Sequence, residues 1–377
     1  MKVELTPEQR ALRSEVRAFV KEEIAPHAGR WDREEATPHE IVDKLAERGW
    51  LGSMVPAEHG GRGLDMISYG VLTEEIGRGC SSIRSLLTVH DMVCRGILRW
   101  GSQGQKESWL PRLARGEVLG AFALSEPEAG SDAAGIRTKA TAAEGGEGFA
   151  LDGTKKWITY GQIAGLFLLF AQLDGKPTAF LMERETPGLT VTPLRGILGT
   201  RASMLAELKL EGARTESMVG RPGFGISHVM GAALDQGRYS VACGSVGIAQ
   251  ACLDACLAYA RERQQFGQPL FEHQLVRAML SDMITNVRAA RLLCMRAGYL
   301  RDIGDPGAIA ETSVAKHFAS ATAMRAATDA VQIHGANGCH DDFPVSRYFR
   351  DAKVMEIIEG STQMQQNTIA RFELEEL

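Results

Sequence analysis

The stretch from Met355 to Gln363 (MEIIEGSTQ) gathers the side chains that chemistry at a weakly acidic C–H bond requires. Glu359 follows two isoleucines, and a carboxylate in an apolar setting is a stronger base because water does not solvate its charge. Ser361 and Gln363, just beyond Gly360, could hold a cofactor beside that base. One alternative remains open, since most carboxylates at the start of a helix are exposed and only favour its dipole.

Two further segments offer groups to a flat or charged ligand. Residues 122–132 (FALSEPEAGSD) begin like a strand and end in a turn dense in hydrogen-bonding groups, although a surface β-turn has the same composition. In residues 153–161 (GTKKWITYG), Trp157 could lay its indole against a flat ring while Thr159 bonds to the edge of that ring. A core tryptophan at the end of a strand is the alternative for Trp157.

Arginines and glycines form a third group, spread over the last part of the chain. Arg238 is the first, residues 261–267 (RERQQFG) follow, and residues 332–338 (QIHGANG) contain a glycine turn. The guanidinium fork binds phosphate through two parallel hydrogen bonds, and a glycine turn lets the backbone approach a ligand closely. For Arg238, a surface salt bridge with Asp235 one turn earlier is the alternative.

The elements that must position these segments fall into three blocks, and the first block is helical. Thr6 predicts a helix start because Gln9 can close a capping box with it, and Pro26 ends the apolar pattern that follows. A second helix is predicted from Pro38 to Arg48, and helical patterns continue to about Arg115.

The second block, residues 120–225, consists of short apolar or alternating runs separated by turns, one of them at residues 144–148. Residues 206–210 alternate apolar and charged, which indicates a half-buried strand. From Val229 onwards long helical patterns return. The predicted fold class is therefore α+β and multidomain, with an N-terminal α-helical domain (1–118), a middle β-barrel domain (119–227) and a C-terminal four-helix bundle (228–377).

Composition excludes several functions. A net charge of -5 and a pI of about 6.0 give no basic surface for nucleic acid. The longest apolar run, residues 163–173, is shorter than the roughly 20 residues that span a bilayer, and no signal-peptide core is present, so we expect a cytoplasmic protein without a membrane partner. The sequence contains no GxGxxG after a strand, GxxxxGK[ST], HExxH or GxSxG motif.

The 7 cysteines form no CxxC pair and have no metal-ligand spacing with histidine, so no metal is expected. Cys252 and Cys256 lie four residues apart in an alanine-rich apolar context. This spacing predicts reduced thiols on one buried helix face.

Taken together, the strings EPEAGSD, GTKKWIT, RERQQFG, QIHGANG, RDAK and IIEGSTQ resemble the acyl-CoA dehydrogenase family, in order, from about residue 5 to residue 372. Members of that family use FAD to oxidise an acyl thioester to its α,β-unsaturated product. The resemblance implies that Glu359 takes the α-proton while the β-hydrogen leaves as hydride to flavin N5. It also implies that the backbone N–H of Glu359 and a ribityl hydroxyl polarise the thioester carbonyl.

The resemblance also assigns binding roles. The implied FAD-binding residues are Phe122, Leu124, Ser125, Ser131, Trp157, Ile158, Thr159, Arg263, Phe266, Gln332, Gly335, Ser361 and Gln363. The implied substrate-binding residues are Ser131, Tyr160, Arg238 and Gly360. Arg263, Phe266, Gln332 and Gly335 would reach the FAD of a neighbouring subunit, which implies a homo-oligomer, either a dimer or a tetramer.

Some positions depart from the usual family pattern and bear on the substrate. They are Ile358, Tyr160, Ala336 and Cys339, of which the tyrosine could narrow the acyl pocket. Residues 80–86 (CSSIRSL) and 355–361 (MEIIEGS) are similar to members that oxidise short polar acyl groups on an acyl carrier protein, for hydroxymalonyl- or methoxymalonyl-type polyketide extender units. In that setting the oxidised bond could be that of an alcohol, with Glu359 still the base.

Two other functions remain open. One is an acyl-CoA dehydrogenase of fatty-acid or amino-acid breakdown, with an electron-transfer flavoprotein or oxygen as the electron acceptor. The other is a non-catalytic member of the family that acts as a binding module.

Overall fold

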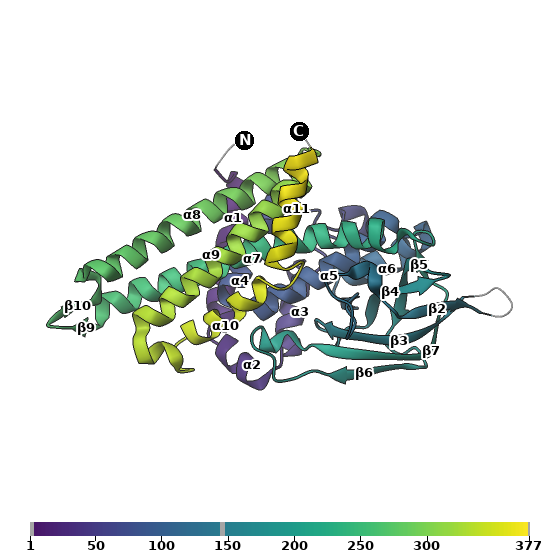
Figure 1. Cartoon of the computed structure of the whole chain (residues 1–377), viewed down its shortest axis with the longest axis horizontal. Helices are drawn as coiled ribbons and strands as arrows, with labels where there is room; N and C mark the ends of the chain where they lie inside the picture. Colours follow the sequence, from purple (N-terminus) through teal and green to yellow (C-terminus); the bar gives the residue numbers. More distant parts are fainter. Residues whose placement is uncertain (1–3, 144–147, 376–377) are drawn as a thin grey trace.

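The computed structural model describes residues 4–143 and 148–375, and it arranges them as helices, a sheet and helices again (Figure 1). The fold-class prediction is confirmed. Most of the turn predicted at residues 144–148 lies outside the described residues. The first helices are α1 (Pro7–Phe19), α2 (Ala28–Glu34), α3 (His39–Glu47), α4 (Met66–Gly79), α5 (Ser81–Trp100) and α6 (Gln103–Ala114).

The predicted helix starts and stops in this block are confirmed. Thr6 and Gln9 form the capping box, and the helical run continues through a π-helical turn to Ile24 before Pro26. Helix α3 ends at Glu47, and Gly49 follows in the left-handed conformation with a φ of 62°. Helix α5 is buried along nearly its whole length.

Among the described residues of the middle block, eight strands form one sheet. They are β1 (Gly120–Ala123), β2 (Lys139–Ala142), β3 (Phe149–Ile158), β4 (Leu166–Leu173), β5 (Lys176–Glu183), β6 (Leu189–Pro193), β7 (Ala206–Thr215) and β8 (Met218–Val219). Their order is β6-β7-β3-β2-β4-β5-β8, with β1 parallel to β4. The apolar run at residues 163–173 supplies β4, which is buried on both faces, and the alternation at 206–210 is the start of β7.

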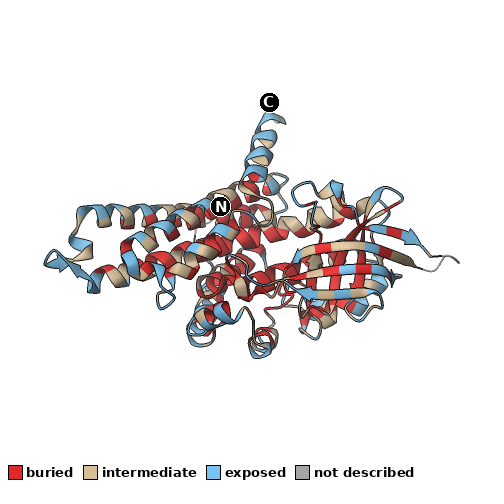
Figure 2. Ribbon diagram, turned by 60° about the horizontal axis from the view of Figure 1, so that its bottom comes forward, coloured by how far each residue is buried: buried red, intermediate tan, exposed pale blue. Residues whose placement is uncertain are grey.

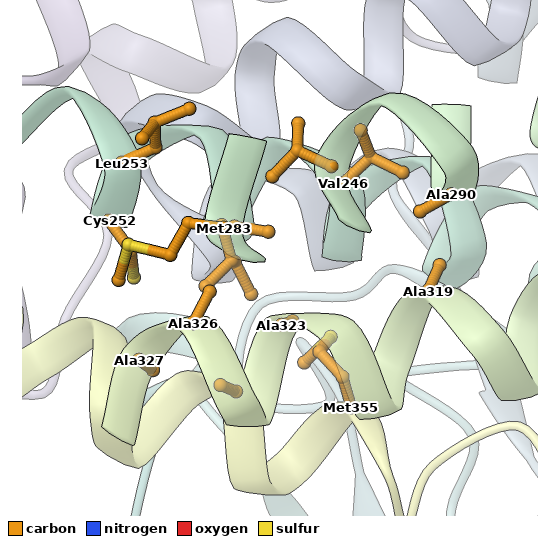
Figure 3. Close-up of a cluster of buried hydrophobic side chains, with 14 of the residues drawn as sticks. Val246, Cys252, Leu253, Met283, Ala290, Ala319, Ala323, Ala326, Ala327 and Met355 are labelled. Atoms are coloured by element: carbon orange, nitrogen blue, oxygen red, sulfur yellow. The ribbon is translucent and has the colours of Figure 1, made fainter. Parts of the chain in front are cut away.

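The last block contains α7 (Gly231–Glu262), α8 (Gln274–Asp302), α9 (Ala308–His334), α10 (Val345–Met355) and α11 (Thr362–Glu375). A hairpin of β9 (Gln264–Gln265) and β10 (Gln268–Pro269) joins α7 to α8. Alanines such as Ala319, Ala323 and Ala326 face the larger side chains of α7 and α8, so the helices approach closely (Figure 3). Cys252 and Cys256 are free and buried in this core, as predicted.

Helix α7 is the central element of the molecule. Together with the π-helical turn before it, residues 225–262 are long and apolar enough to cross a membrane, but 72% of the relevant window is buried inside the protein. Figure 2 shows the buried residues running through the middle of the molecule, from the helices into the sheet. Length and hydropathy here reflect a core helix that neighbouring helices surround.

The RDAK string at residues 350–353 ties the last block to the other two. Asp351 accepts a hydrogen bond of 2.5 Å from the backbone N–H of Thr200, and Arg350 pairs with Asp32 in α2. These contacts fix the end of α10, and with it the segment that carries Glu359.

Candidate active site

Glu359 lies in a tight turn between α10 and α11. Its φ is 56° and that of Gly360 is 88°, so two successive residues are left-handed, which strains a glutamate but not a glycine. Oε2 of Glu359 is enclosed and has no hydrogen-bond partner among the described residues. Burial raises the pKa of this carboxyl to about 7, against the opposing charges of Arg238, Arg84 and Lys316. The carboxyl is therefore poised to exchange a proton near neutral pH.

Three helices hold this turn through its carbonyl groups. Nε of Arg238 in α7 lies 3.4 Å from the carbonyl oxygen of Glu359, and Gln365 in α11 donates to the same oxygen at 3.1 Å. Nζ of Lys316 in α9 donates to the carbonyl oxygen of Gly360 at 2.7 Å. Because the backbone is held from several sides, the strained conformation of Glu359 can persist.

Sequence reasoning missed Lys316 and Gln365. Lys316 is fully buried within the alanine-rich run of α9, and burial lowers its pKa to about 8. A lysine in an otherwise apolar helical face is a signal that could have been noticed, because a buried ammonium needs acceptors. Gln365 lay outside every motif.

Gly237 in α7 makes room for the carboxylate. A β-carbon at this position would lie 2.4 Å from Oε2 of Glu359 and 2.7 Å from Sδ of Met92. Helix α7 therefore passes directly behind the carboxylate, and its glycine is required there for steric reasons.

Buried polar side chains extend from Glu359 between α4, α5 and α7. We call them the polar wall: Tyr69, Arg84, Thr88, Asp91, Gln236 and Ser240. Oη of Tyr69, Nε of Arg84, both carboxyl oxygens of Asp91 and Nε2 of Gln236 are buried without a partner in the described part of the chain. Burial also raises the pKa of Asp91 well above its usual range, and hydrogen bonds from Tyr69 and Ser53 oppose that shift. Tyr69 lies close to Gln236, Ser240 and Asp91, so these groups face one another, and a donor or acceptor from outside the chain would satisfy those that stay unpartnered.

The segments predicted to line a flavin come together at the ends of β1 and β3. The backbone N–H of Lys156 donates to the carbonyl of Ser125 at 2.9 Å, and Nζ of Lys155 donates to that of Leu124 at 3.0 Å. Trp157 sits at an irregularity of β3 with a φ of 65°, and its side chain is 53% exposed. The core alternative for Trp157 is therefore wrong, and the exposed indole beside Thr159 fits the stacking of a flat ring system such as FAD.

Other side chains of these segments have packing roles. The carboxylate of Glu126 is buried, with Lys155 at 2.7 Å and the backbone N–H of Thr138 at 3.0 Å, so it fixes the loop. Phe122 packs on Phe170 with ring centroids 5.1 Å apart. Ile158 is 1% exposed in the core of the sheet, so its side chain packs inside and only its backbone is left to contact FAD, as the prediction for this residue requires. Outward-facing positions of β3 alternate with inward-facing ones, and Ile158 is on the inner face.

Tyr160 also requires a correction. Its side chain is fully buried, and its hydroxyl lies 3.0 Å from both Thr37 Oγ1 and the carbonyl of Ser82. It thus joins the sheet to the N-terminal helices, in place of the predicted contact with substrate. This contact between the sheet and the N-terminal helices explains why a tyrosine stands at this position, where it departs from the usual family pattern.

Among the residues predicted to bind ligand, some make contacts within the chain and others are exposed. Asp235 pairs with Arg301, which removes the alternative partner of Arg238 and leaves that arginine on the Glu359 turn. Oγ of Ser361 lies 3.4 Å from the backbone N–H of Met364 at the start of α11. Gln363 and, in the sheet domain, Ser131 are exposed and thus accessible to a ligand.

The residues predicted to serve a neighbouring subunit lie at the far end of the helical bundle. Arg263, Phe266, Gln332 and Gly335 are all exposed, and Phe266 is 95% exposed at the tip of the β9–β10 hairpin. Tyr259 stacks on His334, which brings the ends of α7 and α9 together. Figure 1 shows this hairpin at one end of the molecule and the sheet at the other. One chain therefore does not bring the two predicted sets of FAD-binding residues together.

Comparisons with known proteins agree with this architecture. Family models of acyl-CoA dehydrogenases match residues 6–117 (N-terminal domain), 121–213 (middle domain) and 223–374 (C-terminal domain). The probable acyl-CoA dehydrogenase YngJ of Bacillus subtilis is 40% identical over 98% of this chain and 99% of its own length.

Two solved structures are similar over nearly the whole chain. Butyryl-CoA dehydrogenase from Megasphaera elsdenii has a TM-score of 0.95 and 34% identity, covering 99% of this chain and 100% of its own. FkbI, described as serving biosynthesis of the methoxymalonyl extender unit of the polyketide Fk520, has a TM-score of 0.87 and 34% identity, covering 96% of this chain and 99% of its own.

Proposed function

The chain belongs to the acyl-CoA dehydrogenase family of FAD-dependent oxidoreductases, and we propose that its substrate is a short, polar acyl thioester carried by an acyl carrier protein. The observation that supports the polar acyl group is the polar wall beside Glu359. Any group of this wall that the acyl group reaches would stay unsatisfied beside a hydrocarbon chain, at a cost of roughly 1–3 kcal/mol. Polar substituents on the acyl group would provide their hydrogen-bond partners.

In this proposal Glu359 is the base that removes the substrate proton. Its pKa of about 7 keeps a large fraction of the side chain ionised at neutral pH while making it more basic than an exposed glutamate. FAD, when bound, accepts the electron pair that leaves the substrate. Trp157, Thr159 and Ser125 would hold its ring system at the end of the sheet.

Backbone groups of the same turn would orient the substrate. The backbone N–H of Glu359, without an acceptor among the described residues, can donate to the thioester carbonyl oxygen and stabilise negative charge there. Lys316 and Gln365 keep the turn in place by binding its carbonyl groups. These residues would position the base without taking the proton themselves.

The proposal that an acyl carrier protein carries the acyl group rests on the similarity of this chain to known proteins. FkbI shares 34% identity with this chain, and residues 80–86 and 355–361 are similar to the branch that makes malonyl-type extender units. The second candidate is a CoA thioester, favoured by the likeness to YngJ and to butyryl-CoA dehydrogenase. An electron-transfer flavoprotein as electron acceptor and a cytoplasmic location stay predictions.

The test measures anaerobic bleaching of the bound flavin by the same polar acyl group, attached either to an acyl carrier protein or to CoA. We expect the carrier-protein thioester to reduce the flavin with the higher kcat/KM. If only the CoA thioester bleaches the flavin, the acyl group is carried by CoA and not by an acyl carrier protein. A yellow protein that no acyl thioester bleaches would instead support the non-catalytic binding module.

We further propose that the FAD site is completed by a second copy of the chain. Figure 1 shows the exposed hairpin with Arg263 and Phe266 at one end of the molecule, away from the sheet whose strand β3 contains Trp157. A guanidinium and an aromatic ring held out at a helix end can reach the cofactor of a neighbour. Sedimentation of the holoenzyme as a monomer that retains FAD would contradict this arrangement.

A further inference from the structure

Helices α5 and α7 run antiparallel to each other past Glu359, and their contacts fix which residues lie opposite. A β-carbon at Gly237 would be 2.7 Å from Sδ of Met92, and one at Gly96 would be 3.6 Å from Cγ1 of Val229. Residue numbers therefore rise along α5 as they fall along α7 and the π-helical turn before it.

The burial of these two helices changes at the level of Glu359. Residues 81–94 of α5 and residues 239–249 of α7 are all buried, and they carry most of the polar wall. In the other direction, most of residues 230–238 are partly exposed, and α5 continues with exposed side chains. A thioester whose α-carbon lies at Glu359 therefore has its acyl group in the buried half of the helix pair and its carrier in the half that opens to solvent.

Two exposed arginines, Arg95 and Arg99, lie one turn apart on α5 in the open half. Neither forms an ion pair with a carboxylate of the residues that the structure describes. Asp235 on α7 lies close enough for its charge to act on Arg95, but its carboxylate is already paired with Arg301. The open half therefore carries positive charge that has no ion-pair partner in the described part of the chain.

Partly exposed aromatic rings continue this surface from the end of α5. The ring of Trp100 lies 4.8 Å from that of His228 and 5.7 Å from that of Phe224, measured between centroids. Phe224 and His228 stack at 4.0 Å, and the guanidinium carbon of the exposed Arg221 lies 5.8 Å from the centroid of Phe224. Arginine and aromatic side chains are enriched at protein–protein interfaces. We call this surface the cationic face: Arg95, Arg99, Trp100, Arg221, Phe224 and His228.

We propose that the cationic face docks the acyl carrier protein that presents the thioester, by pairing its arginines with acidic side chains around the attachment point of the thioester arm. This inference rests on the proposed function, which places the thioester at Glu359. Met92, beside the base, and Arg99 are seven residues apart on α5, which corresponds to on the order of 10 Å. The flexible arm of a carrier protein docked here would cross that distance along the open half of α7.

The spread of the charges favours a protein over the phosphates of CoA. A phosphate group is bound by donors that converge on it. The arginines of the cationic face come from two segments of the chain, with aromatic rings packed beside them, so they suit carboxylates that are distributed over a surface. Complementary charge of this kind also accelerates encounter, most strongly at low ionic strength.

The first test measures binding of a fluorescently labelled acyl carrier protein of acidic surface, loaded with a γ-hydroxybutyryl group, to the FAD-loaded enzyme. Fluorescence anisotropy at low ionic strength gives the Kd. We expect Arg95→Glu/Arg99→Glu to raise the Kd by about tenfold or more, because acidic side chains then face acidic side chains, and we expect added salt to narrow the difference. The matched control is Arg30→Glu/Arg33→Glu, which makes the same charge change at exposed arginines of α2. An equal Kd for wild type and the α5 variant, or no saturable binding by wild type, would overturn the proposal.

A second test identifies what the arginines bind. The kcat/KM for anaerobic flavin bleaching is measured with the γ-hydroxybutyryl thioesters of the carrier protein, of CoA and of pantetheine, the last of which has neither a protein nor a nucleotide. We expect the α5 variant to lose about tenfold or more with the carrier protein alone. A loss confined to the CoA thioester would assign the arginines to CoA phosphates, and an equal loss with all three would place the effect at the active site; either result would overturn the docking face.

The two tests separate this inference from the proposed function. If thioesters bleach the flavin of wild type but the α5 variant binds the carrier protein as tightly as wild type does, the docking face is wrong and acyl-thioester oxidation stands. If the carrier protein binds through the arginines but no thioester bleaches the flavin, the docking face stands and the oxidation is wrong.

Discussion

The turn that carries Glu359 and the β9–β10 hairpin differ in how much the rest of the chain contacts them. The turn is held by α7, α9 and α11, and the carboxylate oxygen at its centre is enclosed. The hairpin is exposed on every residue from Gln264 to Gln268, and Phe266 at its tip has almost no intramolecular packing. The base is thus held within a single chain, whereas the exposed hairpin supports the proposal that a second copy of the chain completes the cofactor site.

Substitutions in the turn should therefore lower the catalytic rate without loss of FAD. Substitutions in the hairpin should weaken FAD binding and leave the rate of the remaining holoenzyme unchanged. Four predictions test this separation, beginning with the largest expected effect.

Glu359→Gln should lower the rate of flavin bleaching by about 10³-fold or more, because the amide keeps the shape but cannot accept the proton. The variant should stay yellow and keep its oligomeric state. Stopped-flow absorbance under anaerobic conditions measures the rate. Glu356→Gln is the control, since Glu356 pairs with Lys353 and should not be needed as a base; undiminished bleaching in Glu359→Gln would move the base elsewhere.

Gly237→Ala should reduce kcat/KM by about 100-fold, because the new methyl group displaces the carboxylate of Glu359 and a shift near 1 Å is enough for such a loss. The FAD content should not change. Gly231→Ala is the control on the same helix, because a β-carbon there would meet only the carbonyl of Ile226 at 3.9 Å. Equal losses in the two variants would show that the effect is on helix α7 as a whole.

Arg263→Ala should weaken FAD binding by about tenfold or more, as expected for the loss of one charge-assisted hydrogen bond to phosphate. Absorbance after dialysis measures the FAD that is retained, and the rate of proton removal in the remaining holoenzyme should be normal. The control is Arg261→Ala, another exposed arginine at the end of α7. Full FAD retention in Arg263→Ala would refute its assignment to the cofactor site.

The smallest effect is expected from Lys316→Met, and it depends on pH. In wild type the base must be ionised, so kcat/KM should rise with pH and level off above about 7, the pKa of Glu359. Lys316 lowers that pKa through its positive charge, so its removal should move the midpoint to higher pH and slow the enzyme about two- to fivefold at pH 6. A parallel loss at every pH would instead indicate that Lys316 acts only through the backbone of Gly360.

Much of the architecture could be predicted from the sequence, because it follows from local patterns. The capping box at Thr6, the alternation that became β7 and the helical spacing around Cys252 each depend on residues a few positions apart. The strings that carry the family resemblance contain Glu359, and the structure places it in a tight, partly enclosed turn. Its role as the base stays a prediction until the variants are measured.

The errors and omissions concern contacts between distant parts of the chain. Tyr160 was predicted at the substrate, but it bonds across 123 positions to Thr37, and nothing local signals that partner. The register of β3 points the side chain of Ile158 into the sheet, so its predicted contact with FAD is left to the backbone. Lys316 was missed because its acceptor, Gly360, lies 44 positions away.

Side-chain types at short spacing were enough to predict the three blocks, several of their helices and strands, and the carboxylate that stands in an apolar string. Long-range packing placed Gly237 behind the carboxylate of Glu359, turned Trp157 outwards, and buried Nε of Arg84 without a hydrogen-bond partner among the described residues. The physical reason is that burial, pKa and unsatisfied hydrogen bonds are properties of a packed environment. That environment is assembled from α5, α7, α9 and α11, which meet only when the whole chain has folded.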